Sequence, residues 1–290
     1  MVEPLQRASR LTSRRRAGAI MGAAGHPIRV RKMGFDFSEV PRHWFYDSAF
    51  VTHVANGLNL VFPAGERFFI RSVKHYLDRI DDPQLLEQVR GFFGQEGRHG
   101  FEHERAFEML EAQGYEIRSY LEWYERWAFD WLEPRLPPNL RLSVTVALEH
   151  FTATLAEQGL TTDFLDHAHP VMRDLLRWHA AEEIEHKSVA FDVLQRVDPR
   201  YRVRVAGLAI ATMGLLFFWR AGTRMLIAQE PPEVRHNLAR ERKAARARGQ
   251  DNSFLRRAIT AYLRRDFHPD QHDNAALARD YLASIGRLAA

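Results

Sequence analysis

Four glutamates and two histidines have the residue types and the spacing of a metal site. Along the chain they follow the order Glu, Glu-x-x-His, Glu, Glu-x-x-His. The six residues are Glu66, Glu96, His99, Glu149, Glu183 and His186. Positions i and i+3 lie on one face of a helix, so each Glu-x-x-His pair presents a carboxylate and an imidazole together. Such a ligand set predicts a four-helix bundle that holds two metal ions between its helices.

The expected turns bring each lone glutamate level with a Glu-x-x-His pair. In the first half, the midpoint between the two falls on the Asp-Asp-Pro at 81–83, and in the second half it falls on the loop 166–170. A chain that turns at the midpoint returns to the same height along the bundle axis. The sequence therefore predicts two helical hairpins, over about 47–114 and 138–198, whose ligands face one another.

A single Glu-x-x-His is weak evidence, because about one match is expected by chance in a chain of this composition. A third copy, at Glu233 and His236, lies in a polar stretch without a partner, and we attribute it to chance. The acidic run at 182–185 is also compatible with a solvated helix face. The metal interpretation is favoured because the other two pairs lie in apolar helices, each with a lone glutamate one hairpin upstream.

Further metal-binding side chains lie near these motifs. His103 follows His99 by four residues and Glu182 precedes Glu183, so His103 and Glu182 are candidate additional ligands. The loop FHPDQHDN carries another group of donors, at His268, Asp270, His272 and Asp273. Loops of this composition are more often solvated turns, so we assign no second metal site there.

Composition limits the class of protein. The 290 residues contain no cysteine, which excludes disulfides, thiolate metal sites and cysteine nucleophiles. The net charge is +4 and the basic residues concentrate near both ends, which argues against a nucleic-acid groove. We expect a cytoplasmic protein in three parts: a basic, flexible segment over 1–32, a di-metal helical domain over 33–229, and a basic helical extension over 230–290 that packs on the bundle.

Two stretches outside the ligand helices are distinctive. The link over 115–137 carries Trp123, Trp127 and Trp131 at i, i+4 and i+8, a stripe typical of core packing. Val205–Trp219 is the most apolar stretch, but it is short of the roughly 20 residues of a membrane span. We expect it to form a fifth helix buried against the bundle, with contact to a membrane surface as the alternative. Two short helices are expected beyond it, over about 252–265 and 274–288.

These motifs resemble those of the ferritin-like di-iron carboxylate superfamily. More narrowly, the blocks FPAGERFF, EGRH at 96–99 and AAEEIEHKSVAFDV resemble a bacterial family labelled "predicted metal-dependent hydrolase", over about 30–275. The resemblance implies an all-α fold, namely a ferritin-like four-helix bundle with a long crossover link, an extra apolar helix and C-terminal helices.

The ligand set and the resemblance together lead to a functional expectation. Four carboxylates and two imidazoles suit iron, with manganese as the alternative. We expect a dinuclear enzyme, an oxidase or oxygenase that uses O2 and an electron donor on a small hydrophobic substrate. The site for this substrate would be lined by aromatic residues, namely Phe68, Phe69, Phe92, Phe93 and Phe151. A metal-dependent hydrolase is the alternative, and a non-catalytic iron-binding or storage protein is the third. A homodimer is compatible with each, and nucleic acid is not expected as a partner.

Overall fold

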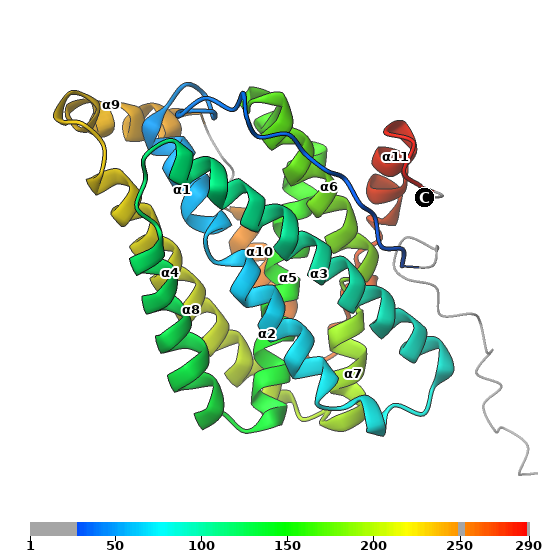
Figure 1. The fold of residues 1–290 in the computed structure, drawn as a ribbon. Coiled ribbons are helices and arrows are strands. Elements are labelled where there is room, and N and C mark those ends of the chain that lie inside the picture. The colour runs from blue at the N-terminus through cyan, green and yellow to red at the C-terminus, as the bar shows by residue number, and fades with distance from the viewer. Residues whose placement is uncertain (1–27, 249–252, 289–290) are drawn as a thin grey trace, which may run out of the picture.

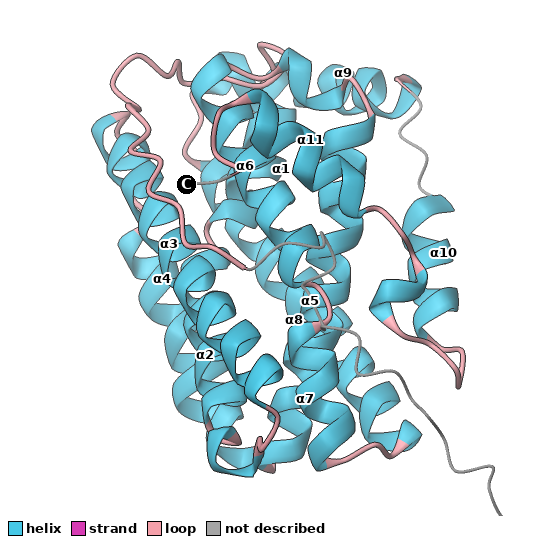
Figure 2. Cartoon of the chain, turned by 90° about the vertical axis from the view of Figure 1, so that its right-hand side faces the viewer, coloured by secondary structure: helices cyan, strands magenta, loops and turns pink. Residues whose placement is uncertain are grey.

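The computed structural model describes residues 28–248 and 253–288. Helices and loops make up this part of the chain (Figure 2), and the only β-type pairing within it is an isolated bridge between Phe45 and Ala168. The prediction of an all-α fold is therefore confirmed. Residues 1–27, which make up most of the predicted flexible segment, lie outside the described residues.

The long helices alternate with short turns. They are α1 (Ala49–Asn59), α2 (Phe62–Lys74), α3 (Pro83–Ala112), α4 (Arg118–Glu125), α5 (Pro138–Thr161), α6 (Pro170–His186), α7 (Val189–Val197), α8 (Tyr201–Ala228), α9 (Pro232–Ala247), α10 (Ser253–Tyr262) and α11 (Ala275–Ser284). A π-helical segment, Arg126–Leu132, continues α4. Single 3-10 turns lie at Leu77–Arg79, Glu133–Arg135, Phe164–His167 and Pro269–Gln271.

The helices begin where the sequence places caps and prolines. A carboxylate oxygen of Asp82 accepts hydrogen bonds from the amides of Gln84 and Leu85 (2.9 and 3.3 Å), which satisfies donors that the first turn of α3 cannot pair internally. Pro83 opens α3 and Pro170 opens α6, at positions where a missing N–H costs nothing. Both predicted hairpin turns are thus confirmed.

The ligand-bearing helices pack around a common interior. α2 packs against α3 and α5, α6 packs against α5 and α3, and α7 extends α6 along the same column. Buried apolar side chains form two clusters. On α2, Glu66 lies between Ala64 of one cluster and Phe68 of the other, and on α3 Glu96 lies between Phe92 and Ala106. The predicted ligands therefore occupy a polar layer between two apolar ones.

α8 packs on the bundle but is not buried. One face contacts α5 and α1 (Figure 1), and there Gly207 lies directly against the backbone of Ser143. On the opposite face Met213 is 65% exposed and Phe217 is 59% exposed. The sequence predicted a fifth helix over Val205–Trp219 that is buried against the bundle. The helix does pack on the bundle, but it is not buried, because no described element covers its outer face.

The sequence predicted that the tryptophan stripe in the link packs in the core, and this prediction is wrong for two of its three residues. Trp127 and Trp131 are each 47% exposed. Only Trp123 packs, with its ring centroid 5.8 Å from that of Phe217 and 5.3 Å from that of Phe218 on α8. The π-helical segment lies on the outside of the bundle, so its apolar side chains have fewer neighbours than a core helix would provide.

The described ends of the chain pack onto the bundle. Arg31, within the segment predicted to be flexible, is 2% exposed. Downstream, α9 contacts α1, α10 contacts α5, and α11 contacts α6 and α5. Helices α10 and α11 lie within the two stretches predicted to be helical near the C-terminus.

The contact between α8 and α5 leads to a stability prediction. A Cβ at Gly207 would lie 2.5 Å from the carbonyl carbon and 2.6 Å from the carbonyl oxygen of Ser143, so Gly207→Ala must push two helices apart. We expect a loss of about 1–3 kcal/mol in the free energy of unfolding, measured with denaturant. Gly214→Ala on the same helix meets nothing within 4 Å and should gain about 0.5–1 kcal/mol. Equal effects at the two sites would contradict this packing.

Candidate metal centre

The six residues predicted as ligands gather at one place inside the bundle. Their ligand atoms form overlapping groups whose members all lie within 4.8 Å of one another. The groups are Glu66, His99 and His179; Glu96, His99 and Glu183; and Glu96, Glu149 and His186. The glutamates come from α2, α3, α5 and α6, and the histidines come from α3 and α6. The two hairpin turns thus bring the lone glutamates and the Glu-x-x-His pairs close together, as expected.

The carboxylates in this cluster are buried without protein partners. Both oxygens of Glu66, Glu96 and Glu149 lack a hydrogen-bond partner, and none of these residues is more than 2% exposed. His99 Nδ1 and His186 Nε2 are also buried and unpaired. Unpaired buried carboxylates are strongly unfavourable, so this donor set fits cations that would bind at its centre.

The orientation of His186 can be worked out from its neighbours. Its Nδ1 donates to Gln95 Oε1 at 2.8 Å, and Gln95 Nε2 donates to Glu185 Oε2 at 2.7 Å and to the carbonyl of Arg29 at 3.0 Å. Because both partners of Gln95 Nε2 are acceptors, the orientation of the Gln95 side-chain amide is fixed. His186 therefore turns the lone pair of Nε2 inward, 3.2 Å from Glu96 Oε1.

His99 is held in the same way by Glu182. Its Nε2 donates to Glu182 Oε2 at 3.0 Å, which leaves Nδ1 facing Glu183 Oε1 at 3.6 Å. Glu182 is thus placed behind a ligand candidate rather than at the centre. Metal-binding histidines usually donate their outer N–H to such a partner, which fixes the tautomer and the ring direction.

A third imidazole, His179, reaches the cluster although it was not among the predicted ligands. Its Nε2 lies 2.9 Å from Glu183 Oε1 and 3.9 Å from Glu66 Oε1, and its ring stacks on His99 with centroids 4.1 Å apart. Its Nδ1 lies 2.6 Å from His103 Nε2, and His103 Nδ1 in turn bonds Asn59. His103 therefore supports His179 from behind. The signal was present in the sequence, because position 179 precedes Glu183 by four residues on the same helix face.

Arg31 joins the supports of two histidines. Its Nη1 donates to Glu182 Oε1 at 2.9 Å and to Glu185 Oε2 at 2.6 Å, and its Nη2 donates to Glu185 Oε1 at 3.0 Å. Glu182 holds His99 directly, and Glu185 holds His186 through Gln95. A single buried guanidinium from the N-terminal segment therefore orients two of the imidazoles.

The electrostatics of the cluster indicate a deficit of positive charge. Burial, together with the neighbouring acids, raises the pKa of Glu66, Glu96 and Glu149 well above the usual value. Burial opposes ionisation of Glu183 as well, but His186 and His179 lower its pKa well below the usual value. Burial would lower the pKa of His186, yet the nearby glutamates raise it to about 9. The cluster therefore attracts protons, as an anionic site built for metal cations would.

The other donors considered from sequence do not join this cluster. Within the described residues, those of the FHPDQHDN loop pair separately: His268 Nε2 lies 2.9 Å from Asp192, and His272 Nε2 lies 2.6 Å from Glu157. Glu233 and His236 are exposed on α9. The interpretations of a solvated turn and of a chance motif are consistent with these placements.

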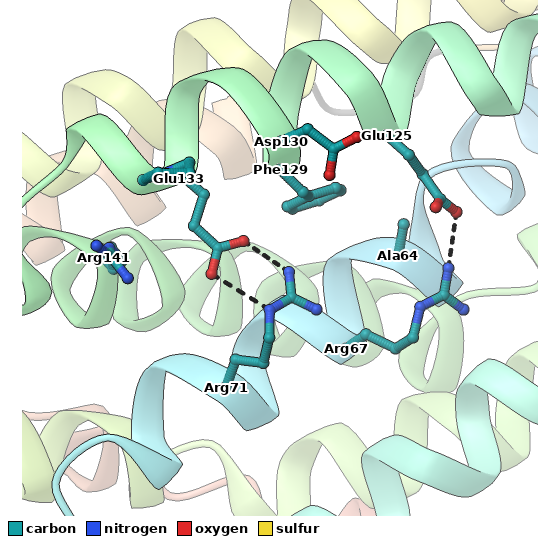
Figure 3. Close-up of a pocket in the computed structure, with 9 residues that line it drawn as sticks. Ala64, Arg67, Arg71, Glu125, Phe129, Asp130, Glu133 and Arg141 are labelled. Carbon is teal, nitrogen blue, oxygen red and sulfur yellow. Dashed lines mark hydrogen bonds and ion pairs between the residues drawn. The ribbon is translucent and has the colours of Figure 1, made fainter.

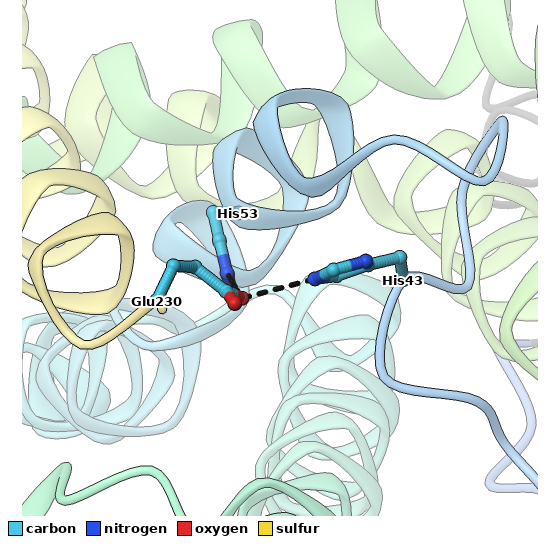
Figure 4. Close-up of side chains that lie close together, drawn as sticks. All are labelled: His43, His53 and Glu230. Atoms are coloured by element: carbon cyan, nitrogen blue, oxygen red, sulfur yellow. Dashed lines mark hydrogen bonds and ion pairs between the residues drawn. The ribbon is translucent and has the colours of Figure 1, made fainter. Parts of the chain in front are cut away.

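A second group of donors lies near the end of α8 (Figure 4). His43 Nε2 and His53 Nε2 lie 3.0 and 2.6 Å from the same oxygen of Glu230, which also accepts from the Tyr115 hydroxyl. Arg42 Nε lies 3.5 Å from the other oxygen. Protein donors thus pair with one oxygen of the carboxylate, while the other oxygen has no hydrogen-bond partner and faces a guanidinium that supplies a positive charge. We interpret this group as a hydrogen-bonded link between α8, α1 and the turn after α3.

A surface pocket of about 330 Å³ lies between α2 and the segment that follows α4 (Figure 3). Its walls are charged, and ion pairs cross it from Arg67 to Glu125 (2.8 Å) and from Arg71 to Glu133 (2.6 Å). None of the candidate metal ligands lines it. The aromatic residues expected to line a substrate site pack elsewhere: Phe92 lies edge-on to His186, with ring centroids 5.1 Å apart.

The fold and the site together define an all-helical protein with a buried cluster of candidate metal ligands. A family model described as "predicted metal-dependent hydrolase" matches residues 29–273, and the chain belongs to this family. No curated protein and no solved structure matches the chain.

Arg31 provides the first test of the centre. Arg31→Met leaves Glu182 and Glu185 buried without their cation and frees the supports of two histidines. We expect metal affinity to fall by about 10–100-fold, measured by titrating the folded protein with Mn²⁺. Lys32→Met, which removes an exposed neighbouring charge, is the matched control. An unchanged dissociation constant in folded Arg31→Met protein would refute the positioning role.

Glu230 leads to a prediction about pH. Burial would raise its pKa, but hydrogen bonds from Tyr115, His53 and His43 lower it to about 2. Because the folded-state value is depressed, this carboxylate stabilises the fold above its usual pKa of 4.5, and the contribution is lost as the pH falls toward 2. Glu230→Gln should therefore cost about 3 kcal/mol of unfolding free energy near neutral pH. The difference from the native chain should shrink on acidification, and a constant difference would argue against the assignment.

Proposed function

We propose that this protein is a metal-dependent hydrolase whose centre is formed by Glu66, Glu96, His99, Glu149, Glu183 and His186, with His179 as a seventh ligand. The observation that supports this most directly is the convergence of unpaired, buried carboxylates and inward-facing imidazole lone pairs in a chain of this family. The family description supports hydrolysis better than the oxidase or oxygenase expected from sequence.

The shape of the cluster favours two metal ions. One group of donors contains Glu66 and His179, another contains Glu149 and His186, and these two groups share no residue. The third group contains Glu96 and Glu183, and it shares one residue with each of the other two. We therefore propose Glu96 and Glu183 as bridging ligands. Four carboxylates nearly balance two divalent cations, so the occupied site carries little net charge in the low-dielectric interior.

When bound, the metal ions would activate water and polarise the bond to be cleaved. The protein's own contribution is orientation. Glu182, Gln95 and His103 hold the outer nitrogens of His99, His186 and His179, so the inner nitrogens cannot turn away. Thr152 donates a hydrogen bond to Glu183 Oε2, which fixes that carboxylate as well.

An oxidase or oxygenase is the second candidate, and the donor set is what favours it. Four carboxylates with few imidazoles suit iron, with manganese as the alternative. The order of the ligands on α2, α3, α5 and α6 also matches the ferritin-like di-iron arrangement, in which a lone Glu alternates with Glu-x-x-His. This chemistry would need O2 and an electron donor. The family description gives no support to the third expectation, a storage protein.

The substrate and the cellular setting remain proposals of the same kind. A small hydrophobic substrate fits a centre set between two apolar clusters, where Phe68 and Phe151 are buried. We also propose a cytoplasmic location, which the absence of cysteine favours, and a homodimer.

Metal occupancy tests the ligand assignment. Glu96→Ala and His186→Ala remove ligands from a bundle that two large apolar clusters hold together, so we expect each folded variant to lose bound metal in elemental analysis. Glu104→Ala is the matched control, since Glu104 lies on the same helix with a side chain that is 51% exposed. Native occupancy in the double variant would show that the metals bind elsewhere.

The reaction class is tested separately on protein of known metal content. A hydrolase should cleave an ester or amide of a hydrophobic acyl group and should retain activity when Zn²⁺ replaces iron. Its reduced, iron-loaded form should not consume O2. Rapid O2 uptake with a change in the near-ultraviolet spectrum, and no hydrolysis with either metal, would reverse the choice in favour of the oxidase.

A further inference from the structure

The outer face of α8 is unlike the surface of an ordinary soluble helix. Exposed positions recur every three or four residues along it, as one continuous stripe. The exposed residues are Arg202, Ala206, Ala209, Met213, Phe217, Arg220, Arg224 and Ala228. The middle of the stripe is apolar over a length of about 18 Å, and arginines stand on both sides of it. α8 contains no aspartate or glutamate.

A second element extends this apolar surface. Trp123 packs on Phe217 and Phe218, which places the end of α4 beside the stripe. In the π-helical segment that follows, Trp127 and Trp131 are half exposed, and their ring centroids lie 5.6 Å apart. The guanidinium of Arg135 lies 4.5 Å from the centroid of Trp131. Half-exposed tryptophans are typical of side chains at the headgroup level of a membrane, and a neighbouring arginine can contact lipid phosphates there.

From this surface we infer that the protein docks on an anionic lipid membrane through α8 and the segment Arg126–Leu132. The apolar middle of the stripe would enter the boundary between headgroups and acyl chains, and the flanking arginines would contact lipid phosphates. α9, which follows α8, adds to the positive charge at that end of the molecule (Figure 1). Its exposed cations are Arg235, Arg240, Arg242, Lys243 and Arg246.

The packing of α8 favours docking over spanning. An 18-residue window of this helix is apolar enough to cross a membrane, with 22% of it buried. However, Arg204 is buried on the inner face and donates to the carbonyls of Tyr262 and Arg264 (2.6 and 2.5 Å). Gly207 and Gly222 lie in close contact with Ser143 and Tyr120. Crossing a bilayer would break these contacts, whereas docking keeps them.

The charges favour lipid over a second copy of the chain. In an antiparallel pair of α8 helices, Arg202 of one copy would approach Arg220 and Arg224 of the other. In a parallel pair, each arginine would approach the same arginine of the other copy. The helix has no acid to neutralise either contact. Of the acids on the neighbouring segment, Glu125 and Glu133 are paired with arginines of α2. An anionic surface satisfies the arginines that self-association would bring together.

Vesicle binding tests this inference without reference to the metal centre. The full-length, metal-loaded protein should sediment with phosphatidylcholine vesicles that contain phosphatidylglycerol, and less with phosphatidylcholine alone or at high salt. Arg220→Gln and Arg224→Gln should each weaken binding about fivefold. Phe217→Glu should weaken it by at least about tenfold, because it places a charge in the acyl boundary. Brominated lipids should quench tryptophan fluorescence, and Trp127→Phe with Trp131→Phe should remove the quenching.

Phe101→Glu is the matched control, because Phe101 is 47% exposed on α3, outside the proposed surface. It should bind vesicles like the native chain, and equal melting temperatures would show that all variants are folded. Failure of the native protein to bind anionic vesicles would overturn the inference. So would a dimer in sedimentation velocity that Phe217→Glu converts to monomer without any vesicle binding, since the stripe would then be a contact between copies.

Discussion

Four carboxylates in the interior of a protein are unfavourable unless positive charge accompanies them, and the architecture follows from this constraint. Glu66, Glu96 and Glu149 have no protein donor, and burial with mutual repulsion raises their pKa values. Each glutamate comes from a different helix. Without cations the centre must take up protons to limit the repulsion between those helices, whereas bound cations would hold the helices together. Metal binding and stability of the bundle should therefore be coupled, as they are wherever a site is preformed only in the folded state.

Charge alone does not make a usable site, because imidazoles can rotate. Here each inward-facing nitrogen is accompanied by an outward hydrogen bond, from His99 to Glu182, from His186 to Gln95 and from His179 to His103. Arg31 then forms ion pairs with both Glu182 and Glu185. The region 182–186 thus divides its acids by role. Glu183 faces the centre, while Glu182 and Glu185, which are three positions apart and so share a helix face, contact the arginine.

The two surfaces of α8 show how one apolar helix can meet two different requirements. Its inner face packs on α5 and α1 through small residues, so the helices approach closely. Its outer face keeps apolar side chains in the middle and arginines at the ends. An apolar patch on the protein surface is tolerated where a partner covers it. A membrane partner would also place a bundle with an apolar interior next to a reservoir of hydrophobic molecules.

The sequence by itself determined the helical class, the hairpin turns and the six residues that gather at the centre, because local rules govern each of these. Asp82 and Pro83 start α3 through contacts within its first turn, and the Glu-x-x-His spacing fixes a shared helix face. Tertiary structure alone decided which donors face inward. His179 reaches the centre, whereas Glu182 and His103 stand behind ligands, since rotation of a helix about its axis depends on what packs around it. It also decided that Arg31 is buried and that the apolar stretch of α8 is covered on one face only, because burial depends on neighbours that are remote in the chain.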